Sequence, residues 1–306
     1  MQKLNIRSFD FSTMADDATV LLIGKRGTGK STTLRNIMYH MRQRLDVGIA
    51  MCPTEDAATD EMGLRSFVPR TLIYDRFCPT ALRELLDYQR KYIKKHGREN
   101  ARRAFVILDD CCAQKGTFKV DEMREVHVNG RHRRIFLVNA VQYLMDVAPD
   151  LRTNIDYVFV LKENIIINRD KLYKQYFGMF DSPKTFYAAM DALTSGHSAM
   201  VLDNKTTSTN VEDCVFYFES AKTVPPFRLC SDVYWGLSDA SLRPPGEQDS
   251  SAGPTPAHVA RAEKEKVTVT RVRRKKEARK KQEEEQCLLN RRCSTVGVAA
   301  GDLRRA

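Results

Sequence analysis

Residues 24–31 read GKRGTGKS and follow a short apolar run, TVLLI, at residues 19–23. The octapeptide fits the pattern G-x-x-x-x-G-K-[ST], in which glycines allow successive backbone N–H groups to converge on an anion. Residues 30–44 predict a helix, whose positively polarised N-terminus would face the same anion. Because an apolar strand precedes the loop and a helix follows it, the pattern indicates a phosphate-binding loop. A glycine turn without a ligand is the alternative.

Individual residues of the loop have distinct expected roles. Lys30 is expected to reach the β- and γ-phosphates of a nucleotide, and the hydroxyl of Ser31 is expected to hold Mg²⁺. ATP and Mg²⁺ are therefore the expected cofactors. The residues expected to bind the nucleotide are Gly24, Gly27, Thr28, Gly29, Lys30, Ser31 and Thr32.

A pair of acids follows a second apolar run, in AFVILDD at residues 104–110. A magnesium nucleotide needs a second acid at the end of a buried strand, and Asp109 suits a water-mediated contact with the ion. Asp110 beside it suits a base that polarises the attacking water. Two solvent-facing aspartates at a strand end, or helix caps, would give the same sequence, so the assignment depends on the loop.

Two further polar residues lie next to apolar runs. Gln142 closes IFLVNAVQ, where an amide would sense the γ-phosphate or orient water, although an ordinary polar strand end is the alternative. Arg152 precedes the apolar run in PDLRTNIDYVF, where an arginine finger would stabilise transition-state charge. The alternative for Arg152 is an ion pair with Asp150 or Asp156, and the pattern alone favours that pairing.

Strand-sized apolar runs alternate with helical segments over the first two-thirds of the chain. This alternation predicts an α/β fold with a mostly parallel sheet between layers of helices. The expected strands are residues 19–23, 47–52, 71–74, 105–108, 135–138 and 156–161, with 199–202 and 215–218 as edge strands. The expected helices are residues 30–44, 79–96, 168–180 and 183–193.

Composition divides the chain of 306 residues into three segments. The 42% of hydrophobic residues suffices for a core, which we assign to one domain over residues 1–242. Residues 243–260 form a Pro/Gly/Ser-rich linker, and residues 261–306 form a basic tail expected to be disordered or an isolated helix. The tail holds 15 Lys/Arg and 7 Asp/Glu, a net charge of +8 that leaves +3 of the total +11 for residues 1–260.

Two classes of protein are excluded by the composition. No apolar run approaches the roughly 20 residues that cross a bilayer, so no membrane span is expected. The eight cysteines include no C-x-x-C spacing, which indicates neither a zinc site nor a disulfide framework.

These segments, taken in order, resemble one family: the DNA-packaging ATPases of poxviruses and giant DNA viruses, within the FtsK–HerA superfamily. The resemblance runs from about residue 19 to residue 221 and includes LLIGKRGTGKST, FVILDDC and HVNGRHRRIFLVNAVQY. The segment PDLRTNIDYVFVLKENIIINRDKLYKQYFG is its most specific part. Several motifs in family-like order are more specific than the loop alone, and they imply a RecA-like sandwich.

The resemblance implies an ATP-driven motor that threads viral double-stranded DNA into a preformed capsid, working as a homo-oligomeric ring. It implies sequence-independent DNA contact, a capsid or inner-membrane packaging site as partner, and a location in the host cytoplasm (the virus factory), the nucleus or the virion. In this family the phosphate-binding lysine corresponds to Lys30, the metal-binding acid to Asp109, the sensor to Gln142 and the finger to Arg152. Cellular members of the superfamily usually carry Glu at the position of Asp110, so the shorter carboxylate must approach the water more closely.

Two other functions share part of this pattern. A nucleotide or nucleoside kinase also uses a phosphate-binding loop, but it needs an arginine-rich lid that we do not find, and it turns over without DNA. An ATP-regulated binding protein would show nucleotide affinity without stimulated hydrolysis. The rate of ATP hydrolysis with and without long duplex DNA separates the three functions.

Truncation after Gln248 tests the role of the tail. The truncated chain is expected to keep the basal rate of ATP hydrolysis, because all the motifs precede the cut. Its DNA affinity is expected to fall and to depend less steeply on salt, because 15 cationic side chains are lost and each phosphate contact releases counterions. DNA binding across a series of salt concentrations measures that slope. An unchanged slope would indicate instead that RVRRKKEARKK is a nuclear-import signal.

Overall fold

The structure, a computed structural model of the chain, describes residues 4–55, 63–111 and 120–242. These residues belong to one structural unit, Met1–Pro245. The predicted linker at residues 243–260 and the predicted basic tail at residues 261–306 lie outside the described residues. None of the helices within the three described ranges combines the length and the apolar character that a membrane span needs.

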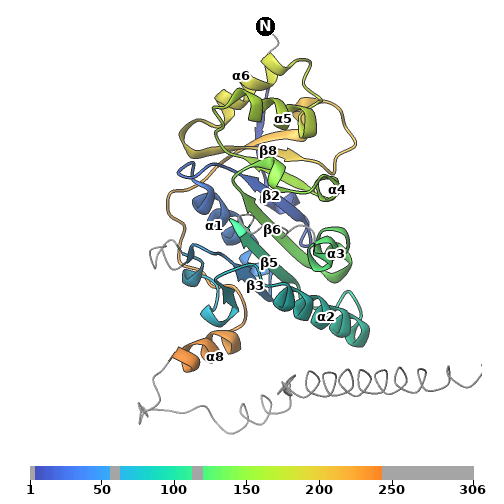
Figure 1. The fold of residues 1–306 in the computed structure, drawn as a ribbon, viewed down its shortest axis with the longest axis vertical. Coiled ribbons are helices and arrows are strands. Elements are labelled where there is room, and N and C mark those ends of the chain that lie inside the picture. Colours follow the sequence, from blue (N-terminus) through green and yellow to red (C-terminus); the bar gives the residue numbers. More distant parts are fainter. Residues whose placement is uncertain (1–3, 56–62, 112–119, 243–306) are drawn as a thin grey trace, which may run out of the picture. The chain divides into compact units, whose positions relative to one another are not determined.

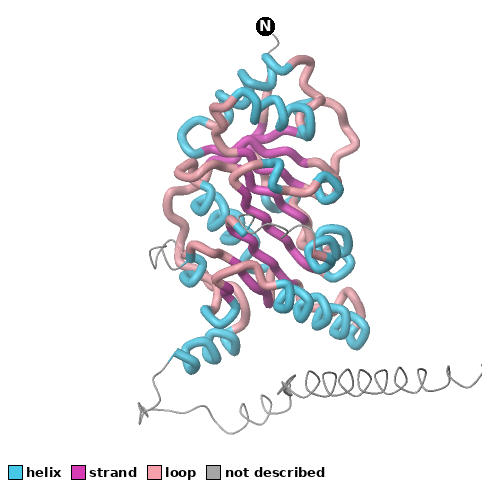
Figure 2. The backbone as a smooth tube through the Cα atoms, in the orientation of Figure 1, coloured by secondary structure: helices cyan, strands magenta, loops and turns pink. Residues whose placement is uncertain are grey.

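Nine strands form one mixed sheet (Figure 1), which Figure 2 shows as a layer of strands flanked by helices. The strands are β1 (Arg7–Ser8), β2 (Thr19–Ile23), β3 (Val47–Met51), β4 (Ile73–Tyr74), β5 (Ala104–Asp109), β6 (Ile135–Val141), β7 (Tyr157–Val160), β8 (Ser198–Asp203) and β9 (Val215–Glu219). Their order is β1-β9-β8-β7-β2-β6-β5-β3-β4. Only the β7–β8 and β8–β9 pairs are antiparallel, so β8 runs against every other strand. β2, which leads into the phosphate loop, lies at the centre.

Helices cover both faces of the sheet. They are α1 (Lys30–Met41), α2 (Pro79–His96), α3 (Asp121–Asn129), α4 (Pro149–Arg152), α5 (Ile166–Tyr176), α6 (Pro183–Leu193), α7 (Val211–Cys214) and α8 (Asp232–Leu242). On one face, α1 packs together with residues of the N-terminal segment and of the segment after β9. On the other face, α2 to α6 supply the buried side chains. In Figure 1, α1 lies on one side of the central strands, and α2 and α3 lie on the other.

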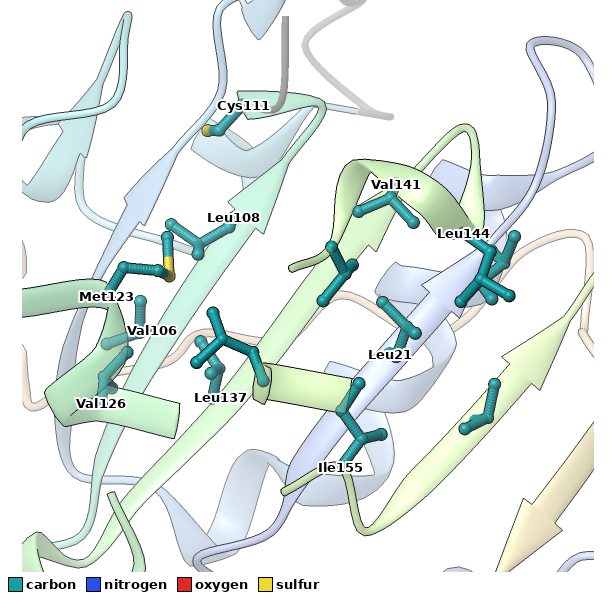
Figure 3. Close-up of a cluster of buried hydrophobic side chains, with 14 of the residues drawn as sticks. Leu21, Val106, Leu108, Cys111, Met123, Val126, Leu137, Val141, Leu144 and Ile155 are labelled. Carbon is teal, nitrogen blue, oxygen red and sulfur yellow. The ribbon is translucent and has the colours of Figure 1, made fainter. Parts of the chain in front are cut away.

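The core consists of strand residues that are covered on both faces. Every residue of β2, β3, β5, β6 and β7 is buried. Continuous apolar runs are the sequence pattern of parallel strands between two layers of helices. Figure 3 shows part of one layer, in which Met123 and Val126 of α3 lie over side chains of β5 and β6.

The sequence located most of these elements. The predicted strand 19–23 coincides with β2, and the predicted helices 79–96 and 183–193 coincide with α2 and α6. The other predicted elements are present with shifted ends; α1, for example, ends at Met41 and continues as a 3₁₀ turn. The predicted fold class, a mostly parallel sheet with helices on both faces, is confirmed.

The prediction of β8 and β9 as edge strands is wrong. β8 lies between β7 and β9, and β1 pairs with β9 on its outer side. The edges are therefore β1 and β4. Arg7–Ser8 is a two-residue, exposed strand that carries no apolar alternation, so the sequence offered no signal for it.

Gly48 in β3 tests the close approach of the strands. A Cβ atom there would overlap the backbone carbonyl oxygen and the ring of Phe105 on the neighbouring β5. Gly48→Ala is therefore expected to lower the free energy of unfolding by about 1–3 kcal/mol, the usual cost of overpacking a core. Gly236→Ala in α8 is the control, because nothing lies within 4 Å of its added Cβ. Urea denaturation of both variants measures the difference, and equal stabilities would contradict the expectation.

Candidate active site

The phosphate loop joins the end of β2 to the start of α1 at the centre of the sheet. Gly27 and Gly29 have φ angles of 80° and 96°, in the left-handed region that favours glycine. The hydroxyl and the N–H group of Thr28 donate to the carbonyl oxygen of Lys25, at 2.7 and 3.2 Å, and close the loop. Gly29 is the N-cap of α1 and offers no side chain to the first N–H groups of the helix. Those N–H groups are available to an anion.

Lys30 lies opposite two acidic side chains at the end of β5. Its Nζ atom is 3.7 Å from Asp109 Oδ1 and 3.4 Å from Asp110 Oδ1. Asp110 has a φ of 57°, a value that is uncommon outside glycine and concentrated at functional sites. The side-chain amide of Gln142, just after β6, donates to Asp110 Oδ2. The structure therefore brings together four residues that the sequence placed on three different elements.

The surroundings of Asp109 fit a bound magnesium ion. Asp109 is 7% exposed, and its buried Oδ1 has no hydrogen-bond partner among the described residues. Burial raises the pKa of this carboxyl group, an effect that the charge of Lys30 partly opposes. Ser31 lines the same cleft, so one carboxylate-bearing and one hydroxyl-bearing residue lie at the cleft together. Mg²⁺ is typically held by such a small oxygen set, completed by water and phosphate oxygens.

These residues line a cleft of about 1010 Å³ at the carboxyl ends of the parallel strands, where ligands of open α/β sheets bind. Of the residues expected to bind the nucleotide, all but Gly24 and Thr28 line this cleft. Gly24 instead allows a close approach of Leu161, the residue after β7, because an added Cβ would lie 2.6 Å from its side chain. Gly24 and Thr28 therefore shape the loop rather than face the cleft.

Glu163, which the sequence analysis did not select, anchors the phosphate loop to the segment after β7. Its carboxylate pairs with Lys25 Nζ and accepts hydrogen bonds from the N–H of Ile165 at 2.8 Å and from Asn168 Nδ2 at 2.9 Å. Burial acts to raise the pKa of Glu163, but the hydrogen bonds, led by that from Lys25, hold it below its ordinary value. Glu163 is therefore an ionised anchor for the second residue of the loop.

Arg152 is not part of the cleft. Its side chain is 4% exposed, and its Nε and Nη1 atoms donate to the carbonyl oxygen of Val147 at 2.9 Å and to Gln175 Oε1 at 3.2 Å. A finger that completes a neighbouring subunit's site must expose its guanidinium group. In the single chain Arg152 therefore has no exposed guanidinium group that could act as the predicted finger, and that role stays a prediction. Arg152 instead ties α4 to α5.

The alternative prediction for Arg152, an ion pair with Asp150 or Asp156, is wrong. Asp150 pairs with Arg124 of α3. Asp156 pairs with Arg131, the first residue of the 3₁₀ turn after α3. Both acids thus bind arginines that lie earlier in the chain.

Three further cleft residues come from elements that the sequence analysis did not connect with the site. Glu219 ends β9, Lys222 follows it, and His197 precedes β8. An acid at the end of an apolar run is the pattern that selected Asp109, and the run VFYF before Glu219 would also have selected Glu219. His197 carried no such signal, because it precedes its strand instead of following it. β8 is antiparallel to β7 and β9, so its first residues lie at the edge of the sheet where those two strands end.

The chain is similar to proteins of large DNA viruses over most of the described domain. The sequence profile described as Poxvirus A32 protein matches residues 7–216. An uncharacterized protein of Acanthamoeba polyphaga mimivirus is 35% identical over 227 residues, which cover 71% of this chain and 78% of that protein. An uncharacterized protein of Invertebrate iridescent virus 3 is 32% identical over 232 residues, which cover 74% of this chain and 85% of that protein.

Among solved structures, the chain is similar to the genome packaging NTPase of Sulfolobus turreted icosahedral virus 2 in complex with AMPPCP. The TM-score is 0.47 at 14% identity, over 68% of this chain and 100% of the other. The cytoplasmic domain of a type VII secretion ATPase from Thermomonospora curvata gives a TM-score of 0.45 at 12% identity, over 80% of this chain and 30% of the other.

Substitutions of the two adjacent acids are expected to have different effects. Asp109→Asn is expected to weaken Mg²⁺-dependent nucleotide binding by about tenfold or more, because a neutral amide is a poorer partner for the ion. Asp110→Asn is expected to leave binding nearly unchanged and to slow turnover by roughly 10²–10⁴-fold, as loss of a general base does. Nucleotide titrations with and without Mg²⁺, together with steady-state rates, measure both effects. The same binding and the same turnover in both variants would remove the division of labour between the acids.

Proposed function

The chain belongs to the family of the poxvirus A32 protein, and from this premise we propose that it is an ATPase that drives viral double-stranded DNA into a capsid. The match to this family confirms the resemblance found in the sequence. The observation that carries the proposal is the convergence of the phosphate loop with Lys30, Asp109 and Asp110 at one cleft. These groups are the ones that phosphoryl transfer to water requires.

The phosphate loop and Lys30 hold the triphosphate. The N–H groups at the start of α1 bind phosphate oxygens, and Lys30 exchanges its two carboxylate neighbours for the β- and γ-phosphates. Ser31 and Asp109 would hold Mg²⁺, which would supply positive charge to neutralise the phosphate oxygens. Glu163 keeps Lys25, and with it the loop, in position from the opposite side.

Asp110 and Gln142 act on the water that attacks the γ-phosphate. Asp110 has a left-handed backbone conformation, and its carboxylate lies near Lys30 and accepts a hydrogen bond from Gln142. Asp110 accepts the proton of the water, and Gln142 orients the carboxylate and senses the γ-phosphate. The hydrogen bond from Gln142 supports a role for Asp110 despite the Glu that is usual in cellular members of the superfamily.

The partners follow from the family. DNA is contacted through its backbone phosphates without sequence readout, because a packaging motor must move along any sequence. The active form is a homo-oligomeric ring at a capsid or inner-membrane packaging site, in the virus factory of the host cytoplasm, in the nucleus or in the virion. The predicted role of Arg152 as a finger would require its guanidinium group, which is buried in the single chain, to become exposed in the ring.

Steady-state ATP hydrolysis, measured with and without long duplex DNA, tests the proposal. DNA is expected to accelerate hydrolysis by the wild-type chain severalfold. Lys30→Ala is expected to lower the rate by roughly 10²-fold or more, because it removes positive charge aimed at the transferred phosphoryl group. Lys184→Ala is the matched control, because Lys184 is exposed on α6 and does not line the cleft.

Each other outcome has a separate meaning. A rate that is independent of DNA, with phosphate transferred to a nucleoside or nucleotide, would identify a kinase. Nucleotide binding without hydrolysis under either condition would identify an ATP-regulated binding protein. Wild-type turnover in Lys30→Ala would place the nucleotide site elsewhere on the chain.

A further inference from the structure

The cleft continues past the phosphate loop, away from the acid pair. β6 and β5, which lead to Gln142 and Asp109, lie on one side of β2, and β7, β8 and β9 lie on the other side. On that second side the cleft is lined by Gly196, His197 and residues 219–222. The cleft therefore extends over both halves of the sheet, with the phosphate loop between them.

The acid pair on the β5–β6 side of the cleft determines which way a bound nucleotide is oriented. The γ-phosphate must lie near Asp109 and Asp110, where the attacking water and the metal ion are held. The loop and the N-terminus of α1 hold the phosphates that precede it. The nucleoside therefore extends toward the β8–β9 side of β2.

Buried hydrogen bonds hold the wall of this second side against the phosphate helix. The side chain of Asn36 in α1, which is 3% exposed, donates to the carbonyl oxygen of Ala221 at 2.9 Å and accepts from its N–H group at 3.0 Å. The hydroxyls of Thr33 and Ser220 are 2.9 Å apart. Because both contacts start from the helix that begins at the phosphate loop, Ser220 and Ala221 keep a fixed position relative to bound phosphates. Such pre-organisation lowers the entropic cost of binding a ligand.

Two side chains on this wall suit a ribonucleoside. His197 has a φ of 73°, and its ring lies beside the loop, since a Cβ added at Gly29 would be 3.4 Å from His197 Nδ1. An aromatic ring beside a phosphate-binding loop is able to stack on the base of the nucleotide whose phosphates the loop holds. Glu219 is the register partner of Ser198, the residue after His197, so both side chains start from the same edge of the sheet. A carboxylate accepts hydrogen bonds from ribose hydroxyls, as in dinucleotide-binding folds.

We propose that His197 and Glu219 form the nucleoside end of the cleft and that this end selects ribonucleoside over 2′-deoxyribonucleoside triphosphates. The ring of His197 stacks on the base, and the carboxylate of Glu219 accepts hydrogen bonds from the 2′- and 3′-hydroxyls. Residues 220–222 close the wall between them and α1. This assignment rests on the proposed function, because it takes the cleft to bind ATP.

Michaelis constants of the full chain for ATP and for 2′-deoxyATP, measured with DNA present, test the assignment. The wild-type chain is expected to have the lower KM for ATP. Glu219→Ala is expected to raise the KM for ATP about tenfold and that for 2′-deoxyATP by a smaller factor, because 2′-deoxyATP keeps the 3′-hydroxyl but lacks the 2′-hydroxyl. His197→Ala is expected to raise both KM values about tenfold, since both nucleotides present the same base. Glu84→Ala and His132→Ala, exposed and outside the cleft, are the matched controls.

Three results would overturn the assignment: equal KM values for the two nucleotides in the wild-type chain, wild-type discrimination in Glu219→Ala, or unchanged KM values in His197→Ala. DNA-stimulated hydrolysis would then still support the proposed function. If Glu219→Ala fails to fold, Glu219→Gln is used instead and is expected to lose part of the discrimination between ATP and 2′-deoxyATP. If His197→Ala fails to fold, His197→Phe is used instead and is expected to keep the wild-type KM values, because its ring can still stack on the base. A wild-type chain that bound ATP in preference to 2′-deoxyATP without hydrolysing it would contradict the proposed function and leave the nucleoside end in place.

Discussion

The parallel alignment of β2, β6 and β5 is the constraint on which the site depends. Ile23 is the register partner of Val141, and Asp109 is the register partner of Ala140, so the three strands end at the same edge. The side chains that follow these strands therefore meet just beyond that edge, where ligands of open α/β sheets bind. Because β6 lies between the other two strands, Gln142 stands between the phosphate loop and the acid pair. A shift of one residue in either pairing would move these side chains apart and turn every side chain of the shifted strand to the opposite face of the sheet.

The charges gathered at this edge are only partly balanced within the chain. Lys30 is the one cation within 4 Å of Asp109 or Asp110 among the described residues, so the cluster keeps a net negative charge. Burial disfavours the charged form of Asp109, which is the physical reason for its raised pKa. A divalent cation at this carboxylate would compensate that cost and would leave Lys30 to neutralise phosphate. The electrostatics of the site therefore suit the metal and the triphosphate together better than either one alone.

Local patterns in the sequence determined the loop, most of the strands and the acid pair. Positive φ angles at Gly27 and Gly29 and the apolar runs before the loop and before Asp109 follow from the residues themselves. Helices α2 and α6 were equally readable, because each begins with a proline and carries an apolar stripe. Gln142 needed the family resemblance in addition, since a polar residue at a strand end is common.

Only the tertiary structure decided which strands are neighbours and which way each side chain points. A strand's local pattern is the same whichever partner it takes and whichever way it runs, so the sequence did not reveal that β8 is antiparallel and carries His197 to the site. Nor did it reveal that Arg152 points inward, because that depends on acceptors at Val147 and Gln175, which lie on separate segments. Buried polar groups must find partners, and those partners come from whatever the fold packs against them.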